Sequence, residues 1–217
     1  RELCKRDFGV EDAKVTIVPP GIDPAFARPV RDDLFRSAYG LERFILWVGA
    51  LEEAKQQYEA IEALNDQEIP LVFIGGYRER SYYEKCKAIA GGHVRFLPYL
   101  QPGSEIIRSA MQSCDVYLEL GADFPGHSAL EAGLAGAPLV LHEHPWSREL
   151  LGDDVTYIEP DNSEIRGGVS RALADGKRGS LVERIKRGLT QPASTARLIE
   201  QIELLLKART GIGSGVR

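Results

Sequence analysis

The sequence predicts an α/β fold, with a doubly wound parallel sheet and helices on both of its faces. Three observations point to this class. Apolar runs rich in β-forming residues alternate with helical patterns from Phe44 onward. Several of these runs are continuously apolar, which is typical of strands buried on both faces. The connections between them are short, so strand-helix-strand units with right-handed crossovers are expected.

Six strands and five helices are expected along this stretch. The first strand is predicted at residues 44–49, where every side chain before the final glycine is apolar, so Trp47 is expected in the core. Further strands are predicted at 71–76, 93–97, 115–120, 137–141 and 155–158, and helices at 55–64, 80–90, 104–113, 128–135 and 147–151. Ligands of such sheets bind beyond the carboxyl ends of the strands, so the loops there are expected to carry the function.

The remaining segments lie at the two ends of the chain. Residues 1–14 are interpreted as a helix remnant or interdomain segment, and residues 15–190 as the domain itself, beginning with a short strand at 15–18 and a Pro/Gly turn. Residues 191–208 are predicted to form an amphipathic helix. The tail at 209–217 is rich in Gly and Ser and is expected to be disordered. The chain begins at Arg1 and not at Met, which suggests a piece of a longer protein.

The composition excludes several classes of partner. The chain has 217 residues and a net charge of -5, with no stripe of Lys and Arg, which argues against nucleic acid. No apolar run approaches the roughly 20 residues of a membrane-spanning helix, so no direct membrane contact is expected. The three cysteines are far apart and form no CxxC pair, which favours reduced thiols and a cytoplasmic protein.

The most informative segment runs from Asp123 to Ala132. Asp123 and Glu131 flank a glycine turn, and a helix is expected to begin near His127. A helix start presents free N–H groups and the positive end of the helix dipole, which suit a diphosphate. Ser128 adds a hydroxyl donor, and a carboxylate at Glu131 can reach a vicinal diol such as a ribose. Taken alone, these residues also fit an ordinary loop-helix junction with a capping residue.

Around this segment the sequence resembles the C-terminal domain of GT-B glycosyltransferases, in particular the family-four retaining enzymes. The signature of that family is Glu-x7-Glu at a helix start, then Ala and a Gly-x-Pro-Val strand. This chain has Asp123-x7-Glu131, then Ala132, and Gly-Ala-Pro-Leu at 136–139. Five further segments match in order: VPPGID at 18–23, VGALEEAK at 48–55, FIGG at 73–76, VRFLP at 94–98 and REL at 148–150. No single motif is specific, but their order is.

The resemblance implies a Rossmann-like domain that forms one half of a GT-B fold and binds a nucleotide-diphosphate sugar. It implies that Glu131 holds the ribose hydroxyls, that Asp123 contacts the donor sugar, and that Lys55 neutralises the leaving diphosphate. The implied donor contacts at backbone and loop positions are Gly49, Gly75, Gly76, Leu97, Pro98, Gly126, His127 and Ser128. The acceptor would bind to an N-terminal domain outside this chain. No metal or other cofactor is expected.

One departure from the family pattern leaves the activity open. The arginine that shares the diphosphate with the lysine falls on Ala50, and Arg78 and Arg80 are the candidate replacements. A degenerate, non-catalytic nucleotide-sugar-binding domain therefore remains an alternative, as does a sugar-nucleotide epimerase on the same fold. A flavodoxin-like signalling domain is a weaker one. His142 and His144 share one face of a strand but have no third ligand, so a metal site is not expected there.

Overall fold

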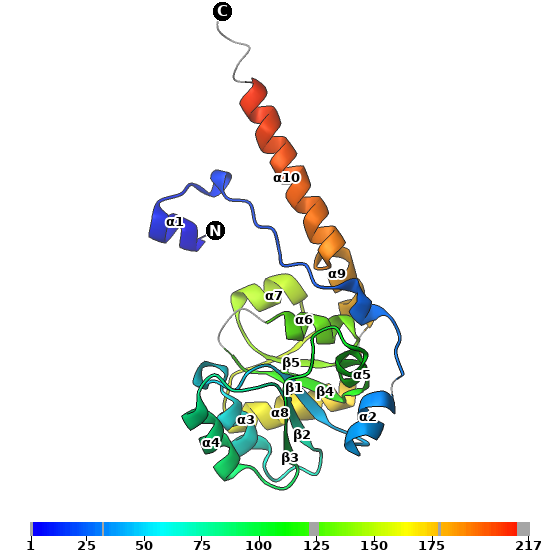
Figure 1. Cartoon of the computed structure of the whole chain (residues 1–217). Helices are drawn as coiled ribbons and strands as arrows, with labels where there is room; N and C mark the ends of the chain where they lie inside the picture. The colour runs from blue at the N-terminus through cyan, green and yellow to red at the C-terminus, as the bar shows by residue number, and fades with distance from the viewer. Residues whose placement is uncertain (1, 32, 122–125, 178, 212–217) are drawn as a thin grey trace, which may run out of the picture.

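The centre of the molecule is a six-stranded parallel sheet (Figure 1). The computed structural model describes residues 2–31, 33–121, 126–177 and 179–211. The strands are β1 (Ile45–Val48), β2 (Leu71–Ile74), β3 (Val94–Leu97), β4 (Val116–Glu119), β5 (Leu139–His142) and β6 (Thr156–Ile158). Their order in the sheet is β3-β2-β1-β4-β5-β6, and every neighbouring pair is parallel. The predicted fold class and all six strands from Phe44 onward are confirmed.

Helices cover both faces of this sheet. The five predicted helices are α3 (Gln57–Leu64), α4 (Arg80–Ile89), α5 (Glu105–Ser113), α6 (His127–Leu134) and α7 (Pro145–Leu151). Three further helices had no predicted bounds: α2 (Asp33–Tyr39), α8 (Asn162–Asp175) and α9 (Gly179–Gly188). The ends of the chain carry α1 (Glu2–Phe8) and α10 (Gln191–Gly211), and 3-10 turns lie at η1 (Asp12–Lys14), η2 (Pro24–Ala27) and η3 (Glu53–Lys55).

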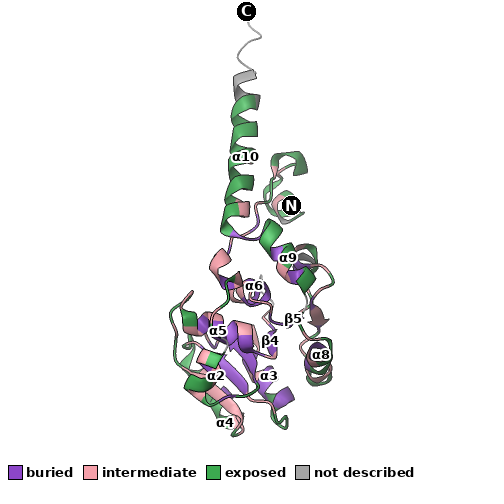
Figure 2. Cartoon of the chain, turned by 90° about the vertical axis from the view of Figure 1, so that its right-hand side faces the viewer, coloured by how far each residue is buried: buried purple, intermediate pink, exposed green. Residues whose placement is uncertain are grey.

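The core consists of two apolar layers, one on each face of the sheet. Alternate strand residues point to opposite layers, as the two-residue period of a strand requires. Leu46 and Tyr117 pack with α2, α5, α6 and α9, whereas Trp47 and Leu118 pack with α3, α4 and α8. Trp47 is 1% exposed, which confirms it as a core residue. Figure 2 shows the buried residues gathered on the sheet and on the inner sides of its helices.

The predicted strand at 15–18 is wrong. These residues have no regular structure and run outside the sheet (Figure 1), and Ile17 is exposed. A strand needs a hydrogen-bonding neighbour, and β1 to β6 leave these residues without one. Pairing begins only at Ile22, which forms an isolated bridge with Thr190 and joins the N-terminal segment to the start of α10.

The C-terminal helix is confirmed, but it is longer than predicted. Residues 209–211, expected in a disordered tail, continue α10, and 212–217 lie outside the described residues. The helix projects away from the sheet (Figures 1 and 2), and six large apolar side chains on it are exposed: Leu198, Ile199, Ile202, Leu204, Leu205 and Leu206. In the part of the chain that the structure describes, no helix is both long and apolar enough to cross a membrane.

Candidate functional site

The predicted site lies at the carboxyl ends of β1 and β4, which are the two central strands. In this strand order the chain leaves β1 toward one edge of the sheet and β4 toward the other, so the loops after them diverge. Folds of this kind bind their ligands in the crevice at this point. Lys55 reaches both loops. A Cβ atom built on Gly49 would lie 3.6 Å from Lys55 Nζ, and one built on Gly121 would lie 3.5 Å from Lys55 Cγ. The structure thus places Lys55 where such folds bind ligands.

The loops after β1 and β2 are joined by a continuation of the parallel ladder. The N–H of Gly49 donates to Ile74 O (2.9 Å), that of Leu51 to Gly76 O (2.9 Å) and that of Arg78 to Leu51 O (3.0 Å). The two backbones approach so closely that a Cβ on Gly75 would lie 2.3 Å from Gly49 O. Gly75, with φ of 151°, is therefore required by packing. A contact of Gly75 or Gly76 with a nucleotide stays a prediction.

Lys55 shares a carboxylate with a second cation. Lys55 Nζ lies 2.9 Å from Glu52 Oε1, and Arg78 Nη1 lies 3.0 Å from Glu52 Oε2. The hydrogen bond from Lys55 holds the pKa of Glu52 below its ordinary value, and Arg78 acts in the same direction. Of the two arginines that the sequence offered as replacements, Arg78 is thus beside Lys55. Arg80 begins α4 and is exposed.

The loop that carries Glu52 is held by a buried glutamine. The Gln57 side chain is 0% exposed, donates to Ala50 O (3.0 Å) and accepts from the Glu52 N–H (3.4 Å). Gln56, between η3 and α3, has a left-handed backbone (φ 59°, ψ 36°), which is uncommon for a residue other than glycine. Together these features fix the backbone between Ala50 and Glu52 and set the turn that presents Lys55.

Glu119, at the end of β4, is a site residue that the sequence analysis did not single out. Its carboxylate accepts from the Gly126 N–H (3.1 Å) and from the Tyr117 hydroxyl (3.1 Å), and Ser128 also hydrogen-bonds to that hydroxyl. Burial raises the pKa of Glu119, although Gly126, Tyr117 and Lys55 oppose the rise. In the sequence, Glu119 is marked only as a single acidic residue within the apolar run 116–120. Glu119 connects β4 to the start of α6.

The start of α6 is therefore only partly used by the protein. Gly126, the N-cap residue, gives its N–H to Glu119, while the N–H groups of His127 and Ser128 have no acceptor among the described residues. The His127 side chain is exposed. Two donors at the positive end of the helix dipole remain available to an anion.

Glu131 lies one turn into α6 and faces a second acid. Burial raises the pKa of Glu131 to about 7, and Asp23 adds to the rise. Asp23 caps η2, which packs against α6. The Glu131 carboxylate accepts no hydrogen bond from any residue that the structure describes. Glu131 is thus a half-buried acceptor to which none of the described residues donates, in the helix predicted to bind a nucleotide.

The other predicted positions lie around the same edge of the sheet. Asp123 falls outside the described residues. Leu97 ends β3 and its carbonyl accepts from the Gly75 N–H (3.2 Å), while Pro98 is exposed just beyond it. His142 ends β5 and His144 follows it, and the centroids of their rings lie 4.2 Å apart. The described residues contain no group of three side chains that could hold a metal ion, and the absence of a metal stays a prediction.

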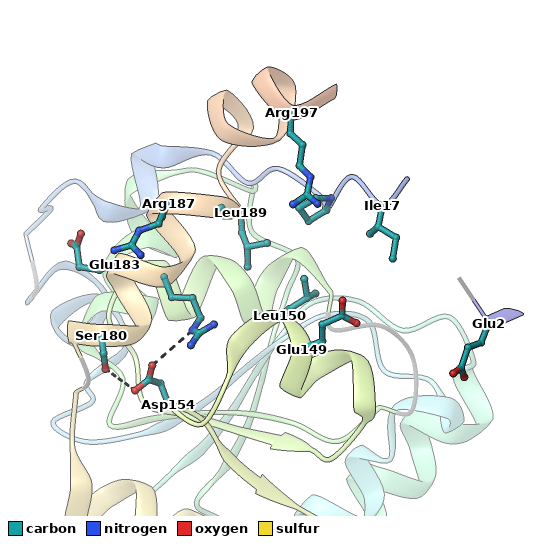
Figure 3. A pocket seen from close by; sticks show the side chains of 13 residues that line it. Glu2, Ile17, Glu149, Leu150, Asp154, Ser180, Glu183, Arg187, Leu189 and Arg197 are labelled. Atoms are coloured by element: carbon teal, nitrogen blue, oxygen red, sulfur yellow. Dashed lines mark hydrogen bonds and ion pairs between the residues drawn. The ribbon is translucent and has the colours of Figure 1, made fainter. Parts of the chain in front are cut away.

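A cavity of about 1290 Å³ lies elsewhere, between the N-terminal segment, α7, α9 and the start of α10 (Figure 3). Its wall includes Arg184 and Ser180, both beside Asp154, at 4.0 Å and 2.7 Å respectively. None of the predicted site residues that the structure describes lines it. The crevice at β1 and β4 therefore remains the candidate site on chemistry rather than on cavity size.

Comparison with solved structures supports the fold. HepE from Anabaena, in complex with UDP and glucose, superposes with a TM-score of 0.76 and 16% identity over 90% of this chain and 58% of that one. AviGT4, a glycosyltransferase involved in avilamycin A biosynthesis, superposes with a TM-score of 0.75 and 19% identity, over 95% of this chain and 62% of that one. Sucrose-phosphate synthase from Thermosynechococcus elongatus superposes with a TM-score of 0.75 and 17% identity, over 95% of this chain and 56% of that one. This chain thus spans less than two thirds of each of these proteins.

Comparison of sequences gives the family. A search of curated proteins finds no match. The family model for glycosyl transferases group 1 matches residues 35–203, which include β1 to β6 and the crevice. The predicted resemblance to one half of a GT-B glycosyltransferase is confirmed by this match and by the shared fold. Because the match covers most of its length, the chain belongs to the group 1 glycosyltransferases.

Proposed function

We propose that this chain is the donor-binding half of a retaining glycosyltransferase that uses a nucleotide-diphosphate sugar. The observation that carries the proposal is Glu131, a half-buried carboxylate to which no described residue donates a hydrogen bond, one helical turn from the N–H groups of His127 and Ser128. Two ribose hydroxyls would supply the missing donors. HepE, which has the same fold, is in complex with UDP and glucose in one structure and with UDP-glucose in another.

The chemistry follows from where charge develops. When the bond between the anomeric carbon and the phosphate oxygen breaks, negative charge grows on the leaving diphosphate. Lys55 supplies a mobile point charge there, and the start of α6 supplies fixed dipoles, so no metal ion is needed in this proposal. Asp123 would contact the donor sugar. The acceptor would bind to a second domain, whose closure aligns the reactants and excludes water.

Ligand-induced stabilisation tests the donor site. UDP, GDP and ADP are titrated against the chain in a thermal-shift assay, because a ligand of the folded state raises the melting temperature with the logarithm of its concentration over Kd. Glu131→Ala should abolish the shift and Lys55→Ala should weaken it. Glu149→Ala, an exposed acid on α7, is the matched control and should leave it unchanged. If no diphosphate raises the melting temperature of the wild-type chain, the proposal fails.

A non-catalytic nucleotide-sugar-binding domain is the second candidate. Ala50 favours it, because this position has no charge to share the diphosphate with Lys55. Both candidates predict the same thermal shift, so turnover of the donor by the full-length protein separates them. Release of free nucleoside diphosphate together with a glycosylated acceptor supports the transferase. Conversion of the donor into an epimeric sugar nucleotide would instead support the epimerase alternative.

A further inference from the structure

Two cations meet one carboxylate at the ends of β1 and β2, and this cluster bears on how a diphosphate is held. We propose that Arg78 is the second diphosphate-binding cation of the site and supplies the charge that Ala50 cannot. The inference rests on the proposed function, because it concerns the same donor site. It adds a residue from the loop after β2 to the binding machinery.

The net charge around Lys55 favours this assignment. A nucleoside diphosphate carries more than one negative charge at neutral pH, and Lys55 supplies only one positive charge. That charge is already opposed by Glu52, 2.9 Å from Lys55 Nζ. Glu52 is 12% exposed on a loop fixed by Gln57, so it remains beside Lys55. Without another cation the group of Lys55 and Glu52 is neutral, and Arg78 makes it positive.

The backbone also places Arg78 beside the loop after β1. The Arg78 N–H donates to Leu51 O, and Leu51 and Tyr77 form a parallel bridge, so the backbone of Arg78 runs beside residues 50–52. Arg78 therefore lies in the loop after β2, next to the loop after β1 that carries Ala50. Its guanidinium reaches Glu52 Oε2, the same carboxylate that Lys55 contacts.

The Arg78 side chain is also exposed enough to change its partner. The Arg78 side chain is 72% exposed and makes one ion pair, whereas the Lys55 side chain is 25% exposed. An exposed ion pair contributes little to stability, so Arg78 can leave Glu52 at small cost when an anion arrives. Its planar fork can then donate two parallel hydrogen bonds to one phosphate.

Isothermal titration of the chain with UDP and with UMP tests the assignment, because the cation is expected to meet the phosphate that UMP lacks. Arg78→Ala removes the charge-assisted hydrogen bonds to the phosphate, so it should weaken UDP binding at least about tenfold and UMP binding less than about twofold. Arg78→Lys should recover part of the loss. GDP with GMP, and ADP with AMP, are compared in the same way.

Two arginine variants serve as controls. Arg166→Ala removes a partly exposed arginine on α8, paired with Asp66 between α3 and β2, and should change neither affinity. Arg80→Ala should also be without effect. The inference is overturned if Arg78→Ala binds UDP as the wild type does, if it loses UMP equally, or if Arg80→Ala causes the selective loss instead. Wild-type protein that binds none of the three diphosphates overturns the proposed function as well, which separates the two failures.

Discussion

Glu131 is half-buried beside a second acid, Asp23, so its protonation depends on whether the chain is folded. Its pKa is about 7 in the folded chain against an ordinary 4.5. Between these two values the folded state binds more protons than the unfolded state, so stability falls as the pH rises through this window. The carboxylate that would bind a ribose therefore destabilises the empty protein above pH 7.

Glu131→Gln should remove this dependence. The variant should be more stable than the wild type at pH 8, by on the order of 1 kcal/mol after allowance for solvent screening, and nearly equal to it at pH 4.5. Urea unfolding at the two pH values measures the difference. Glu149→Gln, at an exposed position, should show no such change with pH. An equal effect of Glu131→Gln at both pH values would contradict the raised pKa.

Glu119 should matter for stability through its hydrogen bonds rather than its charge. Glu119→Ala leaves the Gly126 N–H without its acceptor and removes one partner of the buried Tyr117 hydroxyl. We expect the free energy of unfolding to fall by about 2 kcal/mol. Glu119→Gln keeps an acceptor for Gly126 and should stay within about 1 kcal/mol of the wild type. Equal losses in the two variants, measured by urea unfolding, would argue that the charge itself is needed.

The individual site residues were predictable to different degrees. Lys55 and Glu131 lie in motifs whose spacing alone indicates their place at a strand end and in a helix. Arg78 could be named as a candidate, but its pairing with Glu52 joins residues from separate loops, and only the register of β1 and β2 determines it. Glu119 was not singled out, because a single acid in an apolar strand does not indicate which backbone group it will meet.

Among the structural elements, the paired loops after β1 and β2 depend on a single glycine. A Cβ on Gly75 would lie 2.3 Å from Gly49 O, whereas one on Gly76 would meet nothing within 4 Å. Gly75→Ala should therefore destabilise the fold by roughly 2–4 kcal/mol through backbone strain and displacement of the loop that carries Lys55. Gly76→Ala is the matched control and should cost less than about 1 kcal/mol. Thermal or urea unfolding of the two variants distinguishes them, and equal stability would contradict the close approach.

The limits of predicting elements are clear at α8. Its Gly167-Gly168 pair weakens a helical pattern, since each glycine costs about 1 kcal/mol relative to alanine in a helix. In the structure a Cβ on Gly168 would lie 2.5 Å from Ile158 Cγ2, so the glycine lets α8 lie directly on β6. Residues 15–18 show the opposite error. Their β-forming side chains suggest a strand, but no neighbour is present to pair with them.

The molecule as a whole concentrates its chemistry at one edge of the sheet. Lys55 comes from the connection after β1, Glu119 ends β4, and Glu131 comes from the connection after β4. The parallel order brings the three together around β1 and β4. The alternation of strands and helices made this arrangement predictable without side-chain detail. The chain nevertheless spans only 56–62% of the three similar proteins compared above. Under the proposed function, this edge would bind the donor, and the acceptor would bind to a second domain.

The projecting part of α10 is expected to contribute almost nothing to the stability of this domain. The helix is attached at its start, where the Gln191 N–H donates to Ile22 O, and Leu189 just before it is buried. Beyond that point its apolar side chains are exposed, so no burial energy is gained there. Further along, the exposed hydrogen bond from Thr16 to Gln201 (3.3 Å) is worth little.

Deletion of residues 198–217 should accordingly lower the melting temperature by less than about 3 °C. Leu189→Ala is the contrasting variant: loss of a buried leucine costs roughly 2–5 kcal/mol, and each kcal/mol lowers the melting temperature of a domain of this size by roughly 2–4 °C. Differential scanning calorimetry at low protein concentration compares the two. A deletion as damaging as Leu189→Ala would mean that α10 packs against the domain along its length, contrary to the exposure of its leucines and isoleucines.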